Sequence, residues 1–254
     1  MDKLLTVVIP SYNVEKFLNQ TLDSFICDEA VMKKFEVIVV DDGSKDNTAK
    51  IGKEYADKYP DTFRVISKEN GGHGSTINCG IRNAVGKYFK VVDGDDWVNT
   101  ADFVKLVEDL EKTESEYVFT NYYEYYDDVN RQKAVDFPQF KDGTEYDFAD
   151  VANKVYIPMH ALVIKTSVLK DNNIVIDEKC FYVDVEYVMF PVPFVNKVTF
   201  FDLHVYMYRL ALSTQSVSIL GFQKHINDHL RVTFHMFDFY RDLSLIHISE
   251  PTRH

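Results

Sequence analysis

Short apolar runs and helical patterns alternate along the first 110 residues. The runs are rich in β-branched residues and end in polar turn residues, which is typical of strands. They read LLTVVIP, FEVIVVDD, FRVIS and YFKVVD. Because nearly every position in them is apolar, both faces of each strand should be buried, as in a parallel sheet.

Two amphipathic helices are predicted from the same region. One follows Asn13, a favourable N-cap, and the other, TADFVKLVEDLEK, has Thr100 as its expected cap. Strands and helices in alternation predict an α/β fold, a doubly wound sheet with helices on both faces. In such folds ligands bind where the strands end.

The pattern changes after residue 115. EYVFTNYYEYYDDVNRQKAVDF alternates around an Asp-Asp-Val-Asn turn and predicts a small antiparallel hairpin. HALVIKTSVLKDN predicts a strand and a short helix, KVTFFDLHVYMYRL two strands, and GFQKHINDHLRVTFHMFDFYRDL a helix. Since no linker or repeat intervenes, residues 116–243 are expected to elaborate the domain that residues 1–115 begin. Residues 244–254 do not continue the helical pattern and resemble translated vector sequence, so we expect a non-native tail and a longer natural chain.

The charge and composition of the chain limit the classes of partner that it is expected to bind. The chain has 254 residues, 46% of them hydrophobic, and a formal charge of −12, so it should repel phosphate backbones; nucleic acid is not an expected partner. Three cysteines without paired spacing, no long apolar run and no signal-like start favour a cytoplasmic chain.

Carboxylates follow two of the predicted strands. Asp41 and Asp42 end one strand, and Asp93, Asp95 and Asp96 follow another. Because the carboxyl ends of parallel strands meet at one edge of a sheet, both clusters should face the same crevice and share a ligand. An anionic ligand such as a sugar nucleotide needs a mediating cation there, and clustered carboxylates bind hard divalent cations.

Four stretches, in their order and spacing, resemble the nucleotide-binding half of family 2 glycosyltransferases, which have the GT-A fold. They are VVIPSYNVEKFLNQTLDSF, VIVVDDGSKDNT, KENGGHGSTINCGIRNAVGKY and FKVVDGDDWV, and the resemblance covers residues 4 to about 110. It implies inverting transfer of a sugar from a nucleotide diphosphate donor, foremost a UDP-sugar, to a hydroxyl of a glycan, lipid-linked or polymer acceptor. It also implies polysaccharide or cell-envelope assembly at the inner face of the membrane, with a peripheral membrane contact through a missing C-terminus.

The same resemblance implies a donor site. Pro10, Tyr12, Asp41 and Asp42 would line the nucleoside pocket, with Asp42 accepting a hydrogen bond from the base, usually uracil.

The Asp-Gly-Asp stretch matches the metal-binding D-x-D signature of the family. Alternation along an extended segment puts Asp93 and Asp95 on one side, so that one can reach ribose and the other a cation. Asp95 is the expected ligand of Mg²⁺ or Mn²⁺, with Asp96 as the alternative.

On the acceptor side, Val183-Asp184 occupies the place of an acidic pair in the family. The resemblance implies that Asp184 is the general base, with Glu186 as the alternative. Burial would raise the pKa of Asp184 and the start of a helix would lower it, and the sequence does not decide between them. Arg209 is a candidate clamp for the diphosphate, together with Gln215 and Ser216.

The chain departs from the family pattern at Ile77, where an Arg is usual. Lys68, Arg82 and His73 are candidate replacements, and the Gly-rich turn ENGGHGS before the next helix is a weak candidate for phosphate contact. Four tyrosines and a histidine are candidates either for stacking on acceptor sugars or for packing: Tyr122, Tyr123, Tyr125, Tyr126 and His160.

Two other function classes remain. A sugar nucleotidyltransferase would need a Gly-rich loop with an Arg after the first strand, and IPSYNVEKF has neither residue. The second alternative is a glycosyltransferase-like module that binds a nucleotide sugar without turnover.

Overall fold

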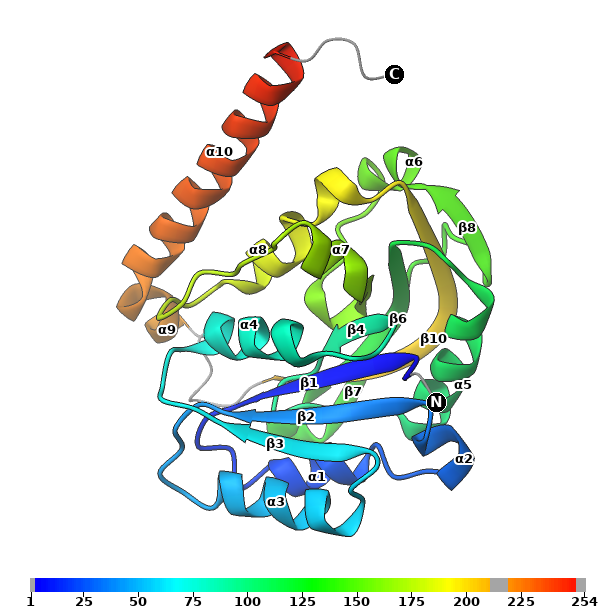
Figure 1. Cartoon of the computed structure of the whole chain (residues 1–254), viewed down its shortest axis with the longest axis vertical. Helices are drawn as coiled ribbons and strands as arrows, with labels where there is room; N and C mark the ends of the chain where they lie inside the picture. Colours follow the sequence, from blue (N-terminus) through cyan, green and yellow to red (C-terminus); the bar gives the residue numbers. More distant parts are fainter. Residues whose placement is uncertain (1–2, 211–218, 250–254) are drawn as a thin grey trace.

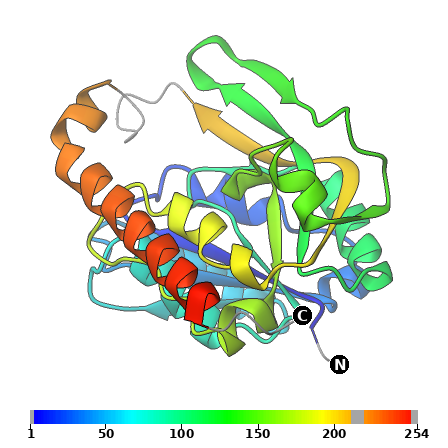
Figure 2. The ribbon, with the colours of Figure 1, turned by 90° about the horizontal axis from the view of Figure 1, so that it is seen from above.

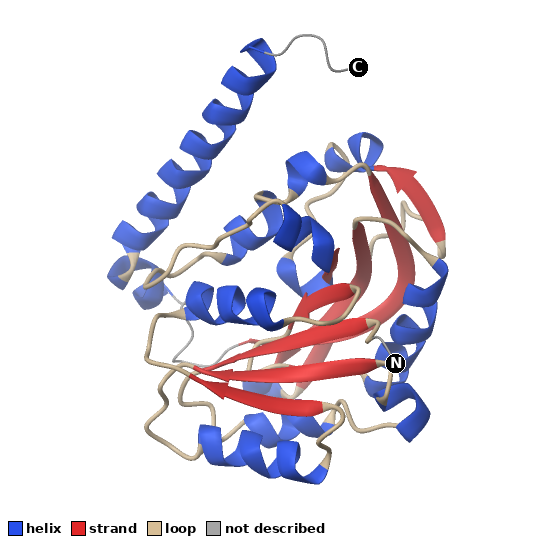
Figure 3. Cartoon of the chain, in the orientation of Figure 1, coloured by secondary structure: helices blue, strands red, loops and turns tan. Residues whose placement is uncertain are grey.

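One curled sheet organises the chain, as Figures 1 and 3 show; this computed structural model describes residues 3–210 and 219–249. The strand order along the sheet is β3-β2-β1-β4-β9-β6-β10-β5, with β7 beside β6 and β8 beside β10. The strands are β1 (Leu5–Ser11), β2 (Phe35–Asp41), β3 (Phe63–Ser67), β4 (Tyr88–Val91), β5 (Trp97–Val98), β6 (Tyr117–Tyr126), β7 (Arg131–Val135), β8 (Thr144–Asp147), β9 (Leu162–Lys165) and β10 (Lys197–Leu210).

The predicted α/β sheet is confirmed in its first half. β1 pairs in parallel with both β2 and β4, and β2 pairs in parallel with β3. Side chains alternate between two cores, since Val8 belongs to one hydrophobic cluster and Val7 and Ile9 to the other. Both faces are therefore buried, which explains the continuous apolar runs.

Helices cover both faces of the sheet, as predicted (Figure 1). On one side lie α1 (Leu18–Asp23), α2 (Glu29–Met32), α3 (Thr48–Lys58) and α5 (Thr100–Asp109). On the other lie α4 (His73–Asn83), α7 (Thr166–Asp171) and α8 (Asp184–Met189). Other helical segments are α6 (Phe148–Ala152), η1 (Leu110–Lys112), η2 (Asp127–Val129), η3 (Met159–Ala161) and η4 (Val192–Phe194).

Both predicted N-caps were wrong. Asn13 has a left-handed backbone with φ of 55°, and its side-chain oxygen accepts the N–H of Lys45 at 2.9 Å, so it joins two loops while α1 begins later, at Leu18. Asn99 caps α5 through the N–H of Ala101 at 3.1 Å. Thr100 instead donates to a backbone carbonyl of the loop after α1.

The second half extends the same sheet. The hairpin of β6 and β7 is confirmed, and so is the strand-helix pair β9 and α7. The two strands predicted from KVTFFDLHVYMYRL are one strand, β10, whose parallel pairing with β6 shifts register on both sides of His204. The N–H of His204 bonds to Asp102 of α5 at 3.0 Å, so the strand bends without ending.

The C-terminal helical region divides at His225 into α9 (Ile219–Lys224) and α10 (Ile226–Ser249). The helix thus continues beyond residue 243, where the pattern predicted its end. α10 runs beside α8 (Figure 2), and the ring of Phe239 lies 4.6 Å from that of Phe190. Among the described residues, no helix has the length and apolar character needed to cross a membrane.

Candidate active site

The two acidic clusters lie at the same edge of the sheet. Ser11 at the end of β1 is in register with Asp41 at the end of β2, and Asp93 follows β4, which pairs with the other side of β1. Their predicted location at the carboxyl ends of parallel strands is confirmed. That they share one ligand stays a prediction.

Asp42 organises the glycine-rich turn. Its buried carboxylate accepts the backbone N–H groups of Gly71 at 2.9 Å and Gly72 at 2.8 Å, and the amine of Lys68 at 2.6 Å. Two of the turn's N–H groups are therefore already bonded. Asp41 accepts the N–H of Ser44 at 3.0 Å.

Two further residues of the predicted nucleoside pocket, Pro10 and Tyr12, lie at the carboxyl end of β1. The Tyr12 side chain is 48% exposed at the end of β1, and the carbonyl of Pro10 accepts the N–H of Gly94 at 3.2 Å. The nucleotide contacts of Pro10, Tyr12, Asp41 and Asp42 stay predictions.

His73 joins the glycine-rich turn to the second acidic cluster. It is the first residue of α4, and its Nε2 lies 2.8 Å from Asp93 Oδ1. Burial acts to lower the pKa of His73, but the charge and hydrogen bond of Asp93, together with the charges of Asp184 and Asp95, outweigh it and the pKa is raised. Conversely, burial acts to raise the pKa of Asp93, and the charge and hydrogen bond of His73, with the charge of His160, bring it below the usual value.

Of the three candidate replacements for the family's Arg, His73 is the one that contacts the second cluster. Lys68 bonds to Asp42 and Ser75, whereas Arg82 lies in the last turn of α4. Ile77 itself is fully buried in the core.

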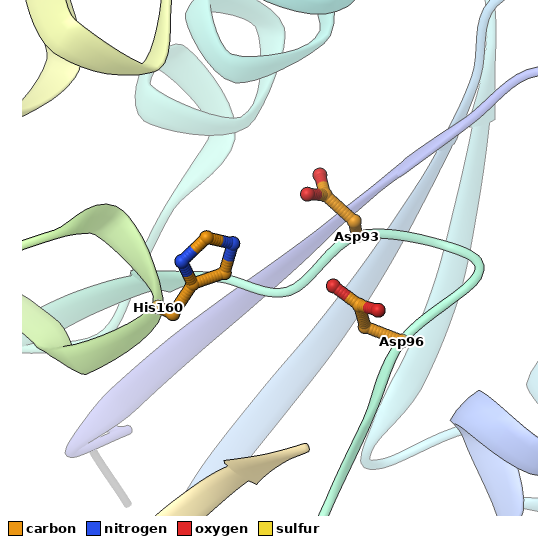
Figure 4. A group of neighbouring side chains, drawn as sticks. All are labelled: Asp93, Asp96 and His160. Carbon is orange, nitrogen blue, oxygen red and sulfur yellow. The ribbon is translucent and has the colours of Figure 1, made fainter. Parts of the chain in front are cut away.

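The Asp-Gly-Asp-Asp segment forms a turn, so the expected extended geometry was wrong. The N–H of Asp96 donates to the carbonyl of Asp93 at 3.0 Å. Glycine is needed at position 94, because a Cβ there would lie 2.9 Å from the Pro10 carbonyl oxygen. The turn directs the carboxylates of Asp93 and Asp96 to the same side (Figure 4).

The three carboxylates of this turn have different environments. Asp96 is buried and accepts hydrogen bonds from the Tyr206 hydroxyl at 2.6 Å and the Arg209 N–H at 2.7 Å. Burial, followed by repulsion from Asp95 and Asp93, raises its pKa well above the usual value. Burial and Asp93 also raise the pKa of Asp95 to about 6, and no described side chain donates a hydrogen bond to the Asp95 carboxylate.

His160 completes a group that can hold a cation. Ligand atoms of Asp93, Asp96 and His160 all lie within 4.8 Å of one another, and their side chains face each other in Figure 4. Two carboxylates and an imidazole are a suitable donor set for a divalent cation, so the residues fit the expected ion. The metal role of Asp95 stays a prediction. No sequence pattern pointed to a metal role of His160, since η3 lies far from the acidic turn in the chain.

Arg209 is buried behind the acidic turn. Its Nε donates to the Asp95 carbonyl at 2.8 Å, its Nη2 donates to Gln20 at 2.6 Å, and its Nη1 pairs with Asp127. The guanidinium also lies 4.7 Å from the Trp97 ring centroid. Its role as a diphosphate clamp stays a prediction, and the predicted partners Gln215 and Ser216 lie outside the described residues.

Asp184 is the first residue of α8, and the structure shows whether burial or the helix start decides the direction of its pKa shift. Burial raises the pKa of Asp184, more than His73 and the N–H groups of the helix start lower it. Glu186 is fully buried and accepts the Asp177 N–H at 2.7 Å, while His235 of α10 lies 3.1 Å away. Glu186 therefore joins α8 to α10 and to the preceding loop.

The tyrosine-rich strand makes internal contacts. Tyr123 stacks on His204 with ring centroids 4.6 Å apart, and Tyr125 meets Trp97 edge-on at 5.0 Å. These contacts account for packing; acceptor stacking stays a prediction.

The fold resembles that of solved glycosyltransferase structures, among them TarS and PcManGT. S. aureus TarS, residues 1–349 in complex with UDP-GlcNAc, superimposes with a TM-score of 0.69 and 23% identity, over 83% of this chain and 59% of the TarS chain. The mannosyltransferase PcManGT from Pyrobaculum calidifontis, in complex with GDP-Man and Mn²⁺, gives a TM-score of 0.65 and 17% identity, over 92% of this chain and 65% of that one. These likenesses confirm the GT-A fold.

Sequence comparison gives the family. The uncharacterized glycosyltransferase EpsJ of Bacillus subtilis (strain 168) is 37% identical over 123 residues, which are 48% of this chain and 35% of EpsJ. The chain thus spans about a third of that relative. Residues 6–172 match the model of glycosyl transferase family 2, and the chain belongs to this family.

Proposed function

We propose that the protein transfers a sugar, with inversion, from a nucleotide diphosphate donor to an acceptor hydroxyl, and that the donor is a UDP-sugar. The observation that carries the proposal is the placement of His73, which bonds to Asp93 of the acidic turn and interacts electrostatically with Asp184 of α8. The expected donor side and the expected base therefore face one region. TarS with UDP-GlcNAc and PcManGT with GDP-Man support a nucleotide-sugar donor.

Asp184 is the proposed general base. Its carboxylate takes the proton of the acceptor hydroxyl while that oxygen bonds to the anomeric carbon, and the bond from that carbon to the diphosphate oxygen breaks. A pKa raised by burial makes the ionised carboxylate a stronger base than an exposed aspartate. One displacement inverts the anomeric centre, so no second carboxylate nucleophile is needed.

Asp93, Asp95 and Asp96 are the proposed cation-binding carboxylates. Asp93 and Asp96 already converge, and Asp95, with no side-chain donor among the described residues, is available to complete the oxygen set or to approach ribose. A bound Mg²⁺ or Mn²⁺ would stabilise the charge that develops on the leaving diphosphate. The Mn²⁺ in the PcManGT complex supports a metal-dependent site.

Pro10, Tyr12, Asp41 and Asp42 form the proposed nucleoside pocket. Tyr12 offers an exposed ring for stacking on the base. Because Asp42 already binds the glycine-rich turn, it would have to share its oxygens with the base. For the acceptor we propose a glycan or lipid-linked hydroxyl in cell-envelope polysaccharide assembly at the inner face of the membrane.

A panel of nucleotide sugars with and without Mn²⁺ tests the proposal. We expect metal-dependent release of UDP from one UDP-sugar, and transfer to a hydroxyl acceptor that depends on Asp184. Binding of a nucleotide sugar without turnover would favour a non-catalytic binding module. Two departures from the family pattern are consistent with this alternative: Ile77 stands in place of an Arg, and Val183 stands in place of an acidic residue. Formation of a sugar nucleotide from a sugar phosphate would favour the nucleotidyltransferase.

A further inference from the structure

We propose that His160 supplies a nitrogen ligand to the divalent cation of this site, beside carboxylate oxygens of Asp93 and Asp96, and that the site therefore prefers Mn²⁺ to Mg²⁺. This inference rests on the proposed metal-dependent function and adds a residue to it that the Asp-Gly-Asp signature does not contain.

The spacing of the three side chains suits one ion. Their ligand atoms all lie within 4.8 Å of one another, as the close-up in Figure 4 shows. Ligands of an octahedral Mg²⁺ lie 2.0–2.1 Å from the ion, so opposite ligands are about 4.2 Å apart. A small rotation of the side chains would bring all three into contact with one ion.

The imidazole is held in place without using its nitrogens. Its ring stacks on Tyr208 with centroids 3.9 Å apart and meets Tyr206 edge-on at 4.9 Å. The backbone carbonyl of His160 accepts a hydrogen bond from the buried Lys90 amine at 2.8 Å. No described residue forms a hydrogen bond with either ring nitrogen.

Tyr206 contacts two of the three proposed ligands. Tyr206 donates its hydroxyl to Asp96 at 2.6 Å and also contacts the His160 ring, so one aromatic residue orients two of the three ligands. Such outer-shell contacts are typical of protein metal sites.

His73 is the alternative nitrogen donor, and the structure makes it the weaker one. Its Nε2 already lies 2.8 Å from Asp93 Oδ1, and it is not part of the converging group. An imidazole ligand favours transition-metal ions, whereas Mg²⁺ prefers oxygen ligands and water. This difference is the physical basis of the expected Mn²⁺ preference.

Pulsed EPR of Mn²⁺ bound to the protein, with and without UDP, tests the assignment. Nitrogen coordinated to Mn²⁺ modulates the electron spin echo, so we expect a ¹⁴N signal in the wild type and its loss in His160→Phe, which keeps the stack on Tyr208. His160→Gln is a second variant without a ring, and His73→Gln is the matched control that should keep the signal. Melting temperatures show whether each variant folds.

Affinity gives an independent readout. Since loss of outer-shell partners alone typically weakens metal binding 10- to 100-fold, we expect the Mn²⁺ dissociation constant to rise at least ~10-fold in His160→Phe, with a smaller change for Mg²⁺. Bound Mn²⁺ without a ¹⁴N signal in the wild type, or a signal lost only in His73→Gln, would overturn the role of His160 and leave the proposed function intact. Failure of Mn²⁺ to bind at all would overturn both.

Discussion

The guanidinium of Arg209 donates from Nε to the backbone carbonyl of Asp95, 2.8 Å away. The same residue donates its backbone N–H to the carboxylate of Asp96 at 2.7 Å. Arg209 is only 5% exposed, so this cation lies inside the protein and holds the acidic turn from behind. It can thus support the site without touching the diphosphate.

Arg209→Ala separates the structural role from the predicted clamp. Removing a buried, paired cation leaves Asp127 and Gln20 without their partner, and we expect the free energy of unfolding to fall by about 3 kcal/mol. Urea unfolding measures this, with Arg82→Ala, on the exposed side of α4, as the control that changes by less than ~0.5 kcal/mol. Unchanged stability with weakened UDP binding would instead identify a diphosphate clamp.

Asp95→Ala should abolish the metal enhancement of UDP binding while the fold is kept. No described side chain bonds to the Asp95 carboxylate, and its removal relieves repulsion from Asp93, so the stability of the metal-free protein should hold or rise. Calorimetry of UDP binding with and without Mn²⁺ measures the effect. Equal enhancement in variant and wild type would leave Asp93, Asp96 and His160 as the ligands and remove Asp95 from the site.

Lys90 predicts a pH dependence of stability. Burial lowers the pKa of its amine from 10.5 to about 7. Between pH 7 and 10 the unfolded chain therefore holds this proton more often than the folded chain, and raising the pH favours folding. Relative to Lys90→Met, the wild type should gain about 2–4 kcal/mol of unfolding free energy between pH 7 and 10.

Urea unfolding of both proteins at three pH values checks the Lys90 prediction. Lys50→Met, at an exposed position of α3, is the control and should show no pH-dependent difference from the wild type. Parallel curves for Lys90→Met and the wild type would show that Lys90 keeps an ordinary pKa in the folded protein.

Deleting residues 244–254 tests the predicted non-native tail. The contacts that Phe239 and Tyr240 make with α8 lie before the deletion, so we expect the free energy of unfolding to change by less than ~0.5 kcal/mol. Loss of cooperative unfolding in the shortened chain would show that the tail contributes to the fold.

The sequence predicted those features that depend on local pattern. β1 and β2 followed from continuous apolar runs, and the position of Asp93 followed from the end of the next run. The turn that brings Asp93 and Asp96 together could not be predicted, because it depends on the approach of Gly94 to the Pro10 carbonyl, across the sheet.

Contacts between residues far apart in the chain could not be predicted from the hydrophobic pattern either. Arg209 lies 114 residues from Asp95 in the chain, and no spacing rule relates them. The bend of β10 depends on Asp102, which bonds to the N–H of His204 from a neighbouring helix. The local pattern predicted two strands in this stretch, whereas the structure has one strand that bends at His204.

Asp184→Asn and Glu186→Gln form a matched pair on α8. The amide keeps the shape of Asp184 but cannot take the proton of the acceptor, so we expect near-normal UDP affinity and melting temperature with transfer slowed by about 10²- to 10⁴-fold. Glu186 lies in the same helix and is fully buried, yet its carboxylate bonds to the Asp177 N–H and contacts His235. Glu186→Gln should therefore lower the melting temperature and leave most of the transfer rate.

The two variants give opposite results under the two assignments. Transfer is measured with a competent acceptor, next to UDP affinity and thermal unfolding for each protein. Normal transfer by Asp184→Asn would exclude Asp184 as the base, since asparagine keeps the shape of the side chain and differs in its inability to take the proton. A rate loss confined to Glu186→Gln, with an unchanged melting temperature, would move the base two residues along α8. The buried contacts of Glu186 with Asp177 and His235 argue against that outcome, because a carboxylate bonded on both oxygens is poorly placed to receive a proton from an acceptor.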